Sequence, residues 1–168
     1  HPGSVGIKGR KIAVLVANGV DAASVDKLIK ALEAHSARPM LLGPTSAPVK
    51  ATDGKQLPVE ASMEGMPSIM FDGIVVPSGK ASTDALAASG LAKHFLLEGY
   101  KHLKAMVLTK ELAAGLGLKE DKGLLLADDQ KAVDAFVKAV EGHRVWEREA
   151  AAEALSLIHI SEPTRQEA

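Results

Sequence analysis

The chain has 168 residues and contains no cysteine. The absence of cysteine excludes disulfide bonds, thiolate metal sites and a cysteine nucleophile, and it fits a reducing compartment. Aromatic residues make up only 3% of the sequence, so a buried core must consist mainly of Val, Leu, Ile, Ala and Met. The length predicts one domain that is large enough to bury such a core.

Long apolar runs and blocks of like charge are missing as well. No run approaches the roughly 18 apolar residues that a membrane-spanning helix needs. The formal net charge is −1, with acidic and basic residues interspersed, so we expect neither nucleic acid nor a membrane as a partner. No two histidines have the spacing of a zinc-binding helix, so we expect no metal site in this segment.

Apolar patterns predict an alternation of strands and helices. Residues 12–17 form an unbroken apolar run rich in β-branched side chains, which is typical of a parallel strand with helices on both faces. The Asn18-Gly19 pair ends this run. We expect further strands over 38–43, 74–77, 105–108 and 123–127, and helices over 24–35, 83–88, 92–103 and from Asp128 or Asp129 to Gly142. This order predicts a three-layer α/β/α sandwich.

Residues 49–61 interrupt that order. Apolar and polar residues alternate on both sides of Asp53-Gly54, which predicts an antiparallel hairpin whose second arm runs to Ala61. We expect a loop over residues 63–70, around Gly65 and Pro67. The sheet is therefore predicted to be mostly parallel, with one inserted β-hairpin.

Candidate site residues follow the strands, because chemistry in open α/β sheets is found at the carboxyl ends of the strands. Asp21 follows the first strand and is a candidate acid, although Asp21 or Ser24 at this place is more typical of a helix cap. Ser78-Gly79 follows the third strand. Its backbone N–H groups are candidates for binding an oxyanion, and an ordinary glycine turn is the alternative.

Thr109 and Lys110 follow the fourth strand, in the place of a nucleophile elbow. Such an elbow presents Ser or Cys on a strained turn near a His base. Here the glycine framing is missing and no histidine lies nearby in the sequence, which favours a passive turn over a threonine nucleophile. His35 and His102 are expected at helix C-termini, where a partly positive imidazole suits the helix dipole.

The two ends of the chain are expected to lie outside the domain. Residues 1–8 are typical of a linker, because Gly, Pro and Ser are frequent there. Residues 149–168 form a tail, in which LSLIHISEPTR matches the translation of a common transposase-type sequencing adapter, followed by index sequence. We therefore assign no fold or function to residues 155–168. A genuine disordered tail is the alternative.

Several stretches of the sequence together resemble one family. They are GRKIAVLVANGVD, ATDGKQLPVEAS, GMPSIMFDGIVVPSG, YKHLK and HRVWER. From about Gly9 to Arg148 the chain is similar to the C-terminal domain of large-subunit catalases. That domain is similar to the DJ-1/PfpI and class I glutamine amidotransferase-like superfamily, so the resemblance implies a flavodoxin-like sandwich.

The resemblance implies that the chemistry resides in an upstream haem core, which disproportionates hydrogen peroxide to water and oxygen. The haem ligands would belong to that core, so this segment would hold neither catalytic residues nor a cofactor. The segment would be a non-catalytic accessory domain that contacts its own upstream core and neighbouring subunits of a homotetramer, in a protein of the bacterial cytoplasm. This chain would then be a fragment of such a catalase.

In this family the domain lacks the cysteine nucleophile of DJ-1-like relatives, and the present sequence agrees. The resemblance places Thr109 or Lys110 near that cysteine's position and Asp21 near the acid that assists it. Together with Ser78 they would form a vestigial site. The alternative is a free-standing DJ-1/PfpI-like hydrolase or glyoxalase-like enzyme that works without the usual cysteine. A domain cut from its core should expose an apolar patch, so we expect the segment to fold alone but to associate.

Overall fold

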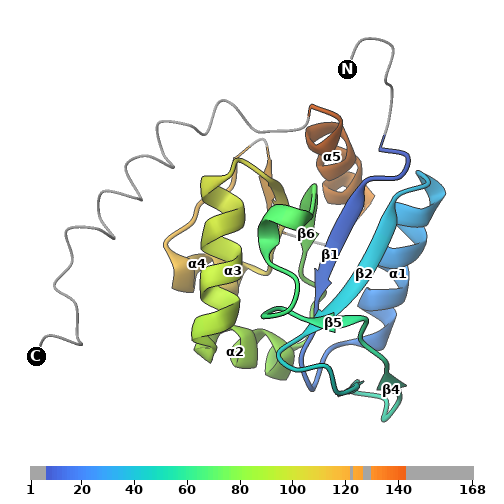
Figure 1. Ribbon diagram of the computed structural model, residues 1–168, viewed down its shortest axis with the longest axis vertical. Helices are drawn as coiled ribbons and strands as arrows, with labels where there is room; N and C mark the ends of the chain where they lie inside the picture. Colours follow the sequence, from blue (N-terminus) through green and yellow to red (C-terminus); the bar gives the residue numbers. More distant parts are fainter. Residues whose placement is uncertain (1–6, 122, 127–129, 143–168) are drawn as a thin grey trace, which may run out of the picture.

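The computed structural model describes residues 7–121, 123–126 and 130–142. Its centre is a six-stranded sheet in the order β5-β2-β1-β6-β7-β8, in which every pair of neighbouring strands is parallel (Figure 1). The strands are β1 (Lys11–Leu15), β2 (Arg38–Gly43), β5 (Ala61–Ser62), β6 (Gly73–Val75), β7 (Ala105–Val107) and β8 (Leu124–Leu125). The first strand of the chain therefore lies inside the sheet, between β2 and β6.

Helices cover both faces of this sheet (Figure 1). They are α1 (Ala22–Ala34) and α5 (Gln130–Glu141) on one face, and α2 (Lys80–Ala88), α3 (Gly90–Lys101) and α4 (Lys110–Leu116) on the other. Successive side chains of a strand point to opposite faces, so Ile12 and Val14 of β1 pack with α1 and α5. Ala13 and Leu15 pack with α2 to α4. The predicted three-layer α/β/α sandwich is confirmed.

Two of the helices bury the apolar stripes that the sequence predicts. The predicted stripe of α1 is Val25, Leu28, Ile29 and Leu32, of which Ile29 is only partly buried. The other three, and the stripe of α5, are at most 4% exposed: Val25, Leu28, Leu32, Val133, Phe136, Val137 and Val140. Burying each such side chain stabilises the fold by about 1.5–3 kcal/mol relative to leaving it in water. Within the part of the chain that the structure describes, no helix combines the length and the apolar character needed to cross a bilayer.

The predicted hairpin is confirmed, but it is shorter than expected. β3 (Val49–Lys50) pairs antiparallel with β4 (Gln56–Leu57), and the turn between them contains Asp53-Gly54. Ala61 does not belong to the second arm. It starts β5, which pairs in parallel with β2 at the edge of the main sheet. Alternation of apolar and polar residues does not distinguish a hairpin arm from a separate edge strand, so the prediction merged the two.

Two short helical segments were not predicted. The expected loop over 63–70 contains a single 3₁₀ turn, η1 (Ser68–Met70). Helix α4 follows β7 directly, where only a turn was expected, and it ends at Gly117. Both segments are shorter than the lengths at which periodicity in a sequence identifies a helix. The expected cap at Asp128 or Asp129 and the tail from residue 149 lie outside the described residues.

Helix α5 packs closely against Gly73, the first residue of β6. A β carbon at this position would lie 2.6 Å from Cζ of Phe136. Phe136 is fully buried, and its ring therefore occupies the space that the glycine leaves free. This contact fixes how deeply α5 packs onto the sheet.

Replacing Phe136 by alanine should lower the free energy of unfolding by about 3–5 kcal/mol, because the ring leaves a cavity that the sheet cannot fill. The matched control is Lys131→Ala, an exposed position on the same helix, which should change stability by no more than about 0.5 kcal/mol. Urea unfolding followed by circular dichroism measures both. Equal losses in the two variants would contradict this account of the packing.

Candidate functional site

The carboxyl edge of the sheet brings together the four residues that the sequence singles out. Asp21 follows β1, Ser78 follows β6, and Thr109 and Lys110 follow β7. These three strands are neighbours and run parallel, so the turns after them lie side by side. Ser78, Thr109 and Lys110 line one cavity of about 300 Å³, together with Val76, Leu108, Glu111 and Leu126. Asp21 does not line it, but its backbone N–H donates to the carbonyl of Ser78 over 2.9 Å.

The carboxylate of Asp21 caps a helix. Asp21 is the N-cap residue of α1, and its Oδ1 accepts a hydrogen bond from the backbone N–H of Ala23 over 3.0 Å. Of the two caps that the sequence offers for this helix, Asp21 is the one used. Ser24 has a different role, because its Oγ accepts the backbone N–H of Ser78 over 3.0 Å. The N–H group of Ser78 that was a candidate for an oxyanion is therefore already bonded.

The turn after β6 is closed by the turn after β1. Gly79 has φ 138°, in the region that favours glycine, and a β carbon there would lie 2.7 Å from the carbonyl oxygen of Gly19. The hydroxyl of Ser82, at the start of α2, accepts the backbone N–H of Ala17 over 3.0 Å and is fully buried. The backbone at the start of α2 thus packs against the turn after β1.

Thr109 has a relaxed backbone and a bonded hydroxyl. Its φ and ψ are −73° and 152°, which is ordinary extended geometry, whereas a nucleophile elbow holds its nucleophile on a strained turn. Thr109 is the N-cap of α4, and its Oγ1 accepts the backbone N–H of Leu112 over 3.2 Å. This geometry gives the hydroxyl oxygen a structural task as a helix cap.

Histidine is absent from the described residues that line this cavity. His35 and His102 are the C-cap residues of α1 and α3, as predicted. Helices that connect parallel strands run antiparallel to them, so both imidazoles lie at the opposite edge of the sheet from Thr109. His94 is exposed on α3 and lines a different cavity. No described imidazole is therefore in place to act as a base on Thr109.

Charges around the cavity are exposed. Lys80 pairs with Asp84 over 2.8 Å in the first turns of α2. The hydrogen bond to Asp84 raises the pKa of Lys80, with smaller contributions from the charges of Asp84 and Glu111. Lys80 therefore stays protonated at neutral pH. Among the described residues, no group of three or more His, Asp or Glu side chains is arranged to hold a metal ion.

None of the described histidines is placed to bind a haem. A haem needs an axial ligand in a pocket that controls polarity and access. His35 and His102 lie at helix ends, and His94 is exposed on a helix face. None of these three imidazoles is buried, so none offers the enclosed coordination that a resident haem requires.

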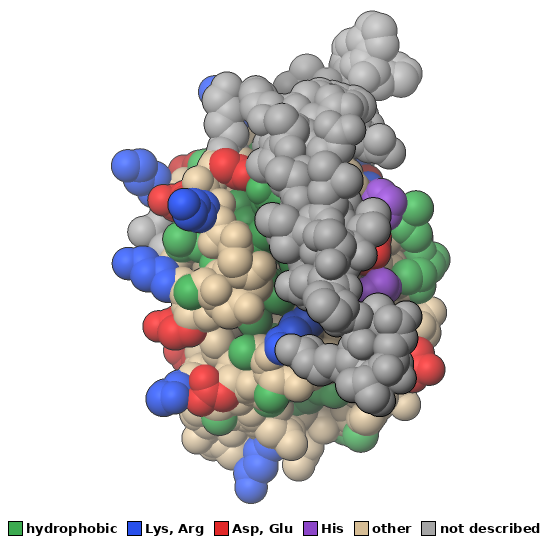
Figure 2. Space-filling model, turned by 90° about the vertical axis from the view of Figure 1, so that its left-hand side faces the viewer, with side chains coloured by type: hydrophobic (Ala, Val, Ile, Leu, Met, Phe, Trp, Pro, Cys, Tyr) green, Lys and Arg blue, Asp and Glu red, His purple; other side chains and the backbone are tan. Residues whose placement is uncertain are grey.

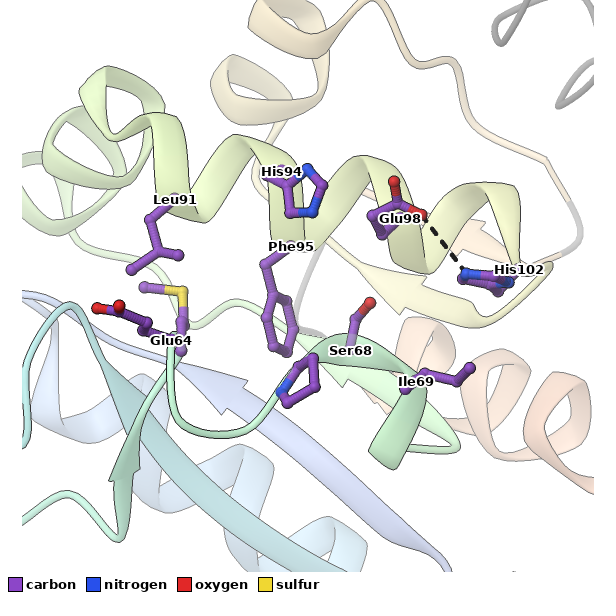
Figure 3. A pocket seen from close by; sticks show the side chains of 10 residues that line it. Glu64, Ser68, Ile69, Leu91, His94, Phe95, Glu98 and His102 are labelled. Carbon is purple, nitrogen blue, oxygen red and sulfur yellow. Dashed lines mark ion pairs between the residues drawn. The ribbon is translucent and has the colours of Figure 1, made fainter.

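A second cavity, of about 380 Å³, lies between α3 and the segment that precedes β6 (Figure 3). Its polar lining includes Glu64, Ser68 and Glu98, which the sequence analysis missed. The signal for Glu98 was available, because His94, Glu98 and His102 are spaced by four residues and share one face of a helix. No sequence signal places Ser68 under that face, since it comes from a segment expected to be a loop.

The structural role of Asp21 can be measured separately from any role as an acid. Asp21→Ala should lower the free energy of unfolding by about 1 kcal/mol. Asp21→Asn should leave the free energy of unfolding nearly unchanged, because asparagine caps helices as well as aspartate does. Chemical denaturation of the two variants gives the comparison. If Asp21→Asn lost as much stability as Asp21→Ala, the negative charge rather than the cap would be the important feature.

Comparison with known proteins identifies relatives over most of the chain. A family model described as the C-terminal domain found in long catalases matches residues 8–150. Catalase HPII of Pseudomonas putida is 99% identical over 155 residues, which cover 92% of this chain and 22% of that protein. Catalase HPII of Pseudomonas aeruginosa is 40% identical over 155 residues, covering 89% of this chain and 22% of that protein. The chain thus spans less than a quarter of the length of these relatives.

Solved structures show the same fold at low sequence identity. DJ-1beta of Drosophila melanogaster is similar with a TM-score of 0.68 and 15% identity, covering 89% of this chain and 98% of that one. A DJ-1 superfamily protein of Salmonella typhimurium gives a TM-score of 0.67 and 18% identity, covering 92% of this chain and all of the other. The fold is therefore that of the DJ-1/PfpI-like, flavodoxin-like proteins. By its sequence, the chain belongs to the family of C-terminal domains found in long catalases.

Proposed function

We propose that this chain is a non-catalytic accessory domain of a long haem catalase, whose chemistry takes place in a preceding part of the polypeptide. One observation carries the proposal. At the carboxyl edge of the sheet, the side chains of Asp21 and Thr109 cap helices and the N–H group of Ser78 is bonded within the protein. The groups that a DJ-1-like enzyme would need for catalysis are used to hold the fold together.

The reaction of a catalase requires a redox cofactor, which this segment is not expected to hold. Disproportionation converts two hydrogen peroxide molecules into two water molecules and one oxygen molecule, and haem iron supplies the oxidation and reduction that this needs. The chain has no cysteine, and none of the described histidines is placed to bind a haem. The relatives that carry this domain are named as catalases and are more than four times as long. A haem core in the missing length fits both facts.

The domain's role would then be assembly and stability. We infer that it spans residues 9–148, a range supported by the family match over residues 8–150. Residues 1–8 would link it to the core, and residues 155–168 would come from a sequencing adapter. Its partners would be its own core and the neighbouring subunits of a homotetramer in the bacterial cytoplasm. Asp21, Ser78, Thr109 and Lys110 would remain as a vestigial site without a catalytic role.

The alternative function is that of a DJ-1/PfpI-like hydrolase or glyoxalase-like enzyme. The cavity that gathers Ser78, Thr109 and Lys110 at the carboxyl edge favours it, as does the fold. It requires Thr109 to attack a substrate without a neighbouring imidazole and after giving up its bond to Leu112. These requirements make it the weaker of the two proposals.

Full-length Pseudomonas putida catalase HPII, whose matching part is 99% identical to this chain, tests the proposal. In that protein, the double variant Thr109→Ser/Lys110→Gln should keep peroxide turnover per haem within about twofold of the unaltered enzyme, since neither side chain would stabilise a transition state. Oxygen release and haem absorbance measured on the same samples give this ratio. A loss of more than about tenfold at unchanged haem content would contradict a non-catalytic role.

The 168-residue chain provides the complementary measurement. It should show no Soret band after incubation with haem, no oxygen release from peroxide, and no turnover of methylglyoxal. Methylglyoxal turnover that disappears in Thr109→Ala would establish the alternative enzyme instead. Sequencing the source DNA upstream should also reveal a catalase core in frame with His1, and a start codon just before His1 would refute the proposed parent.

A further inference from the structure

Two large hydrophobic side chains are exposed next to each other in η1. Ile69 is 64% exposed and Met70 is 46% exposed, while the other large hydrophobic side chains of the described residues are buried or partly buried. Figure 2 shows hydrophobic side chains grouped beside histidines at the right-hand edge of the face it presents. Leaving apolar area in water costs about 25 cal/mol per Å². Neighbouring exposed side chains of this size therefore favour a partner that covers them.

The exposed pair continues into a groove. Ile69 also lines the cavity between η1 and α3, whose apolar wall includes Met63, Pro67 and Phe95. Phe95 extends from α3 toward the segment below it (Figure 3) and packs against Phe71, with ring centroids 6.2 Å apart. Patch and groove thus form one surface, which we name the η1 face: Ile69, Met70 and the lining of this groove.

Ser68 adds a hydroxyl to the lining of the groove. Ser68 is only 4% exposed and points toward α3 (Figure 3). Its side chain makes no hydrogen bond to any other residue that the structure describes. Among the described residues no fully buried side-chain oxygen or nitrogen lacks a partner, so this hydroxyl is accessible to water, and an incoming group can bond it in place of water. The groove therefore offers a bonding position as well as apolar area.

The rim of the groove is acidic. Glu64 and Glu98 line it, with His94 and His102, and no lysine or arginine lies among the lining residues that the structure describes. Oε2 of Glu98 lies 3.4 Å from Nε2 of His102, as the dashed line in Figure 3 marks. An apolar floor under two carboxylates is complementary to a surface that presents an apolar side chain next to a lysine or arginine.

The first residue of β1, Lys11, is bonded to a residue close to the η1 face. The backbone N–H of Lys11 donates to Oδ2 of Asp72 over 3.0 Å, and the N–H of Asp72 donates to the carbonyl of Lys11 over 2.8 Å. Met70 precedes Asp72 by two residues, so their Cα atoms are at most about 7 Å apart. From Lys11 the described chain leads back to Ile7, which is buried among side chains of α1 and α5. Polypeptide that precedes Ile7 is therefore tethered to the same domain as the exposed pair. A tethered partner has an effective concentration in the millimolar range, far above that of a free second copy.

We propose that the η1 face is the docking site for the preceding catalase region of the same polypeptide, which inserts an apolar side chain into the groove and places a lysine or arginine between Glu64 and Glu98. This inference rests on the proposed function, because it needs a preceding region. The family match describes the domain as C-terminal, and the chain covers only 22% of its Pseudomonas putida relative. Most of the parent polypeptide would therefore precede Lys11 and be available to dock.

Hydrogen–deuterium exchange tests the docking site directly. The two samples are full-length Pseudomonas putida catalase HPII and the 168-residue chain, the latter at low micromolar concentration. Backbone amides of residues 63–70 should exchange at least about tenfold more slowly in the full-length protein, because docking removes the openings that expose them. Equal exchange in the two samples overturns the proposal. Protection in the full-length protein that disappears when its subunits are dissociated also overturns it, by assigning the face to a neighbouring subunit.

Substitutions provide the second measurement. Ile69→Arg or Met70→Arg in the full-length protein should lower the midpoint of thermal unfolding by about 2 °C or more and leave the 168-residue chain unchanged. The matched control is Ala34→Arg, at an exposed position of α1 on the other face of the sheet, which should shift neither protein. Equal shifts in both proteins would mean that the residues act within the domain, and no shift in the full-length protein would mean that nothing docks there. Either result overturns the proposal.

Failure of the docking site and failure of the proposed function give different results. Haem content and oxygen release from peroxide are recorded on the same full-length samples. An active haem protein with unprotected residues 63–70 refutes the docking site alone. A full-length protein without haem or activity refutes the proposed function, and the docking proposal with it.

Discussion

The fold depends on the complete burial of β1. From Ile12 to Val16 every side chain is 0% exposed, so the strand needs apolar cover on both faces. Helices α1 and α5 supply it on one side and α2 to α4 on the other. An unbroken run of buried apolar side chains, such as Ile12 to Val16, is typical of an inner strand of a parallel sheet. The remaining strands must therefore extend the sheet on both sides of β1, and the turns after β1, β6 and β7 meet at one edge.

Much of this architecture could be predicted from the sequence, because burial leaves a pattern in the order of residues. The apolar run at 12–17 and the stripes of α1 and α5 are long enough to identify their elements. Short elements are not. Helix α4 has seven residues, includes Gly115, and is held by the packing of Leu112, Ala113 and Leu116 against the core. Isolated helices of that length are unstable in water, so tertiary contacts rather than local sequence determine this one.

In the candidate site, too, some features could be predicted from the sequence and others depend on tertiary contacts. The positions of Asp21, Ser78 and Thr109 at one edge follow from parallel strands, and the sequence predicts them. The bond between Ser24 and Ser78 joins residues 54 positions apart, and no local pattern reveals it. The exposure of Ile69 and Met70 is equally hidden, because apolar residues in a sequence look like core until the fold shows what covers them. Fold similarity to DJ-1-like enzymes does not carry their chemistry over, since function depends on the groups at the site.

The hydroxyls of Ser24 and Ser82 limit which chemistry the carboxyl edge of the sheet could take up. Each belongs to a helix and accepts the N–H group of a residue at or after a strand end. A cysteine introduced at position 109 would find relaxed backbone geometry, no imidazole nearby among the described residues, and the N–H of Ser78 already bonded. Placing a working nucleophile at this edge would therefore require changes to the bonds that join α1 and α2 to the strand ends.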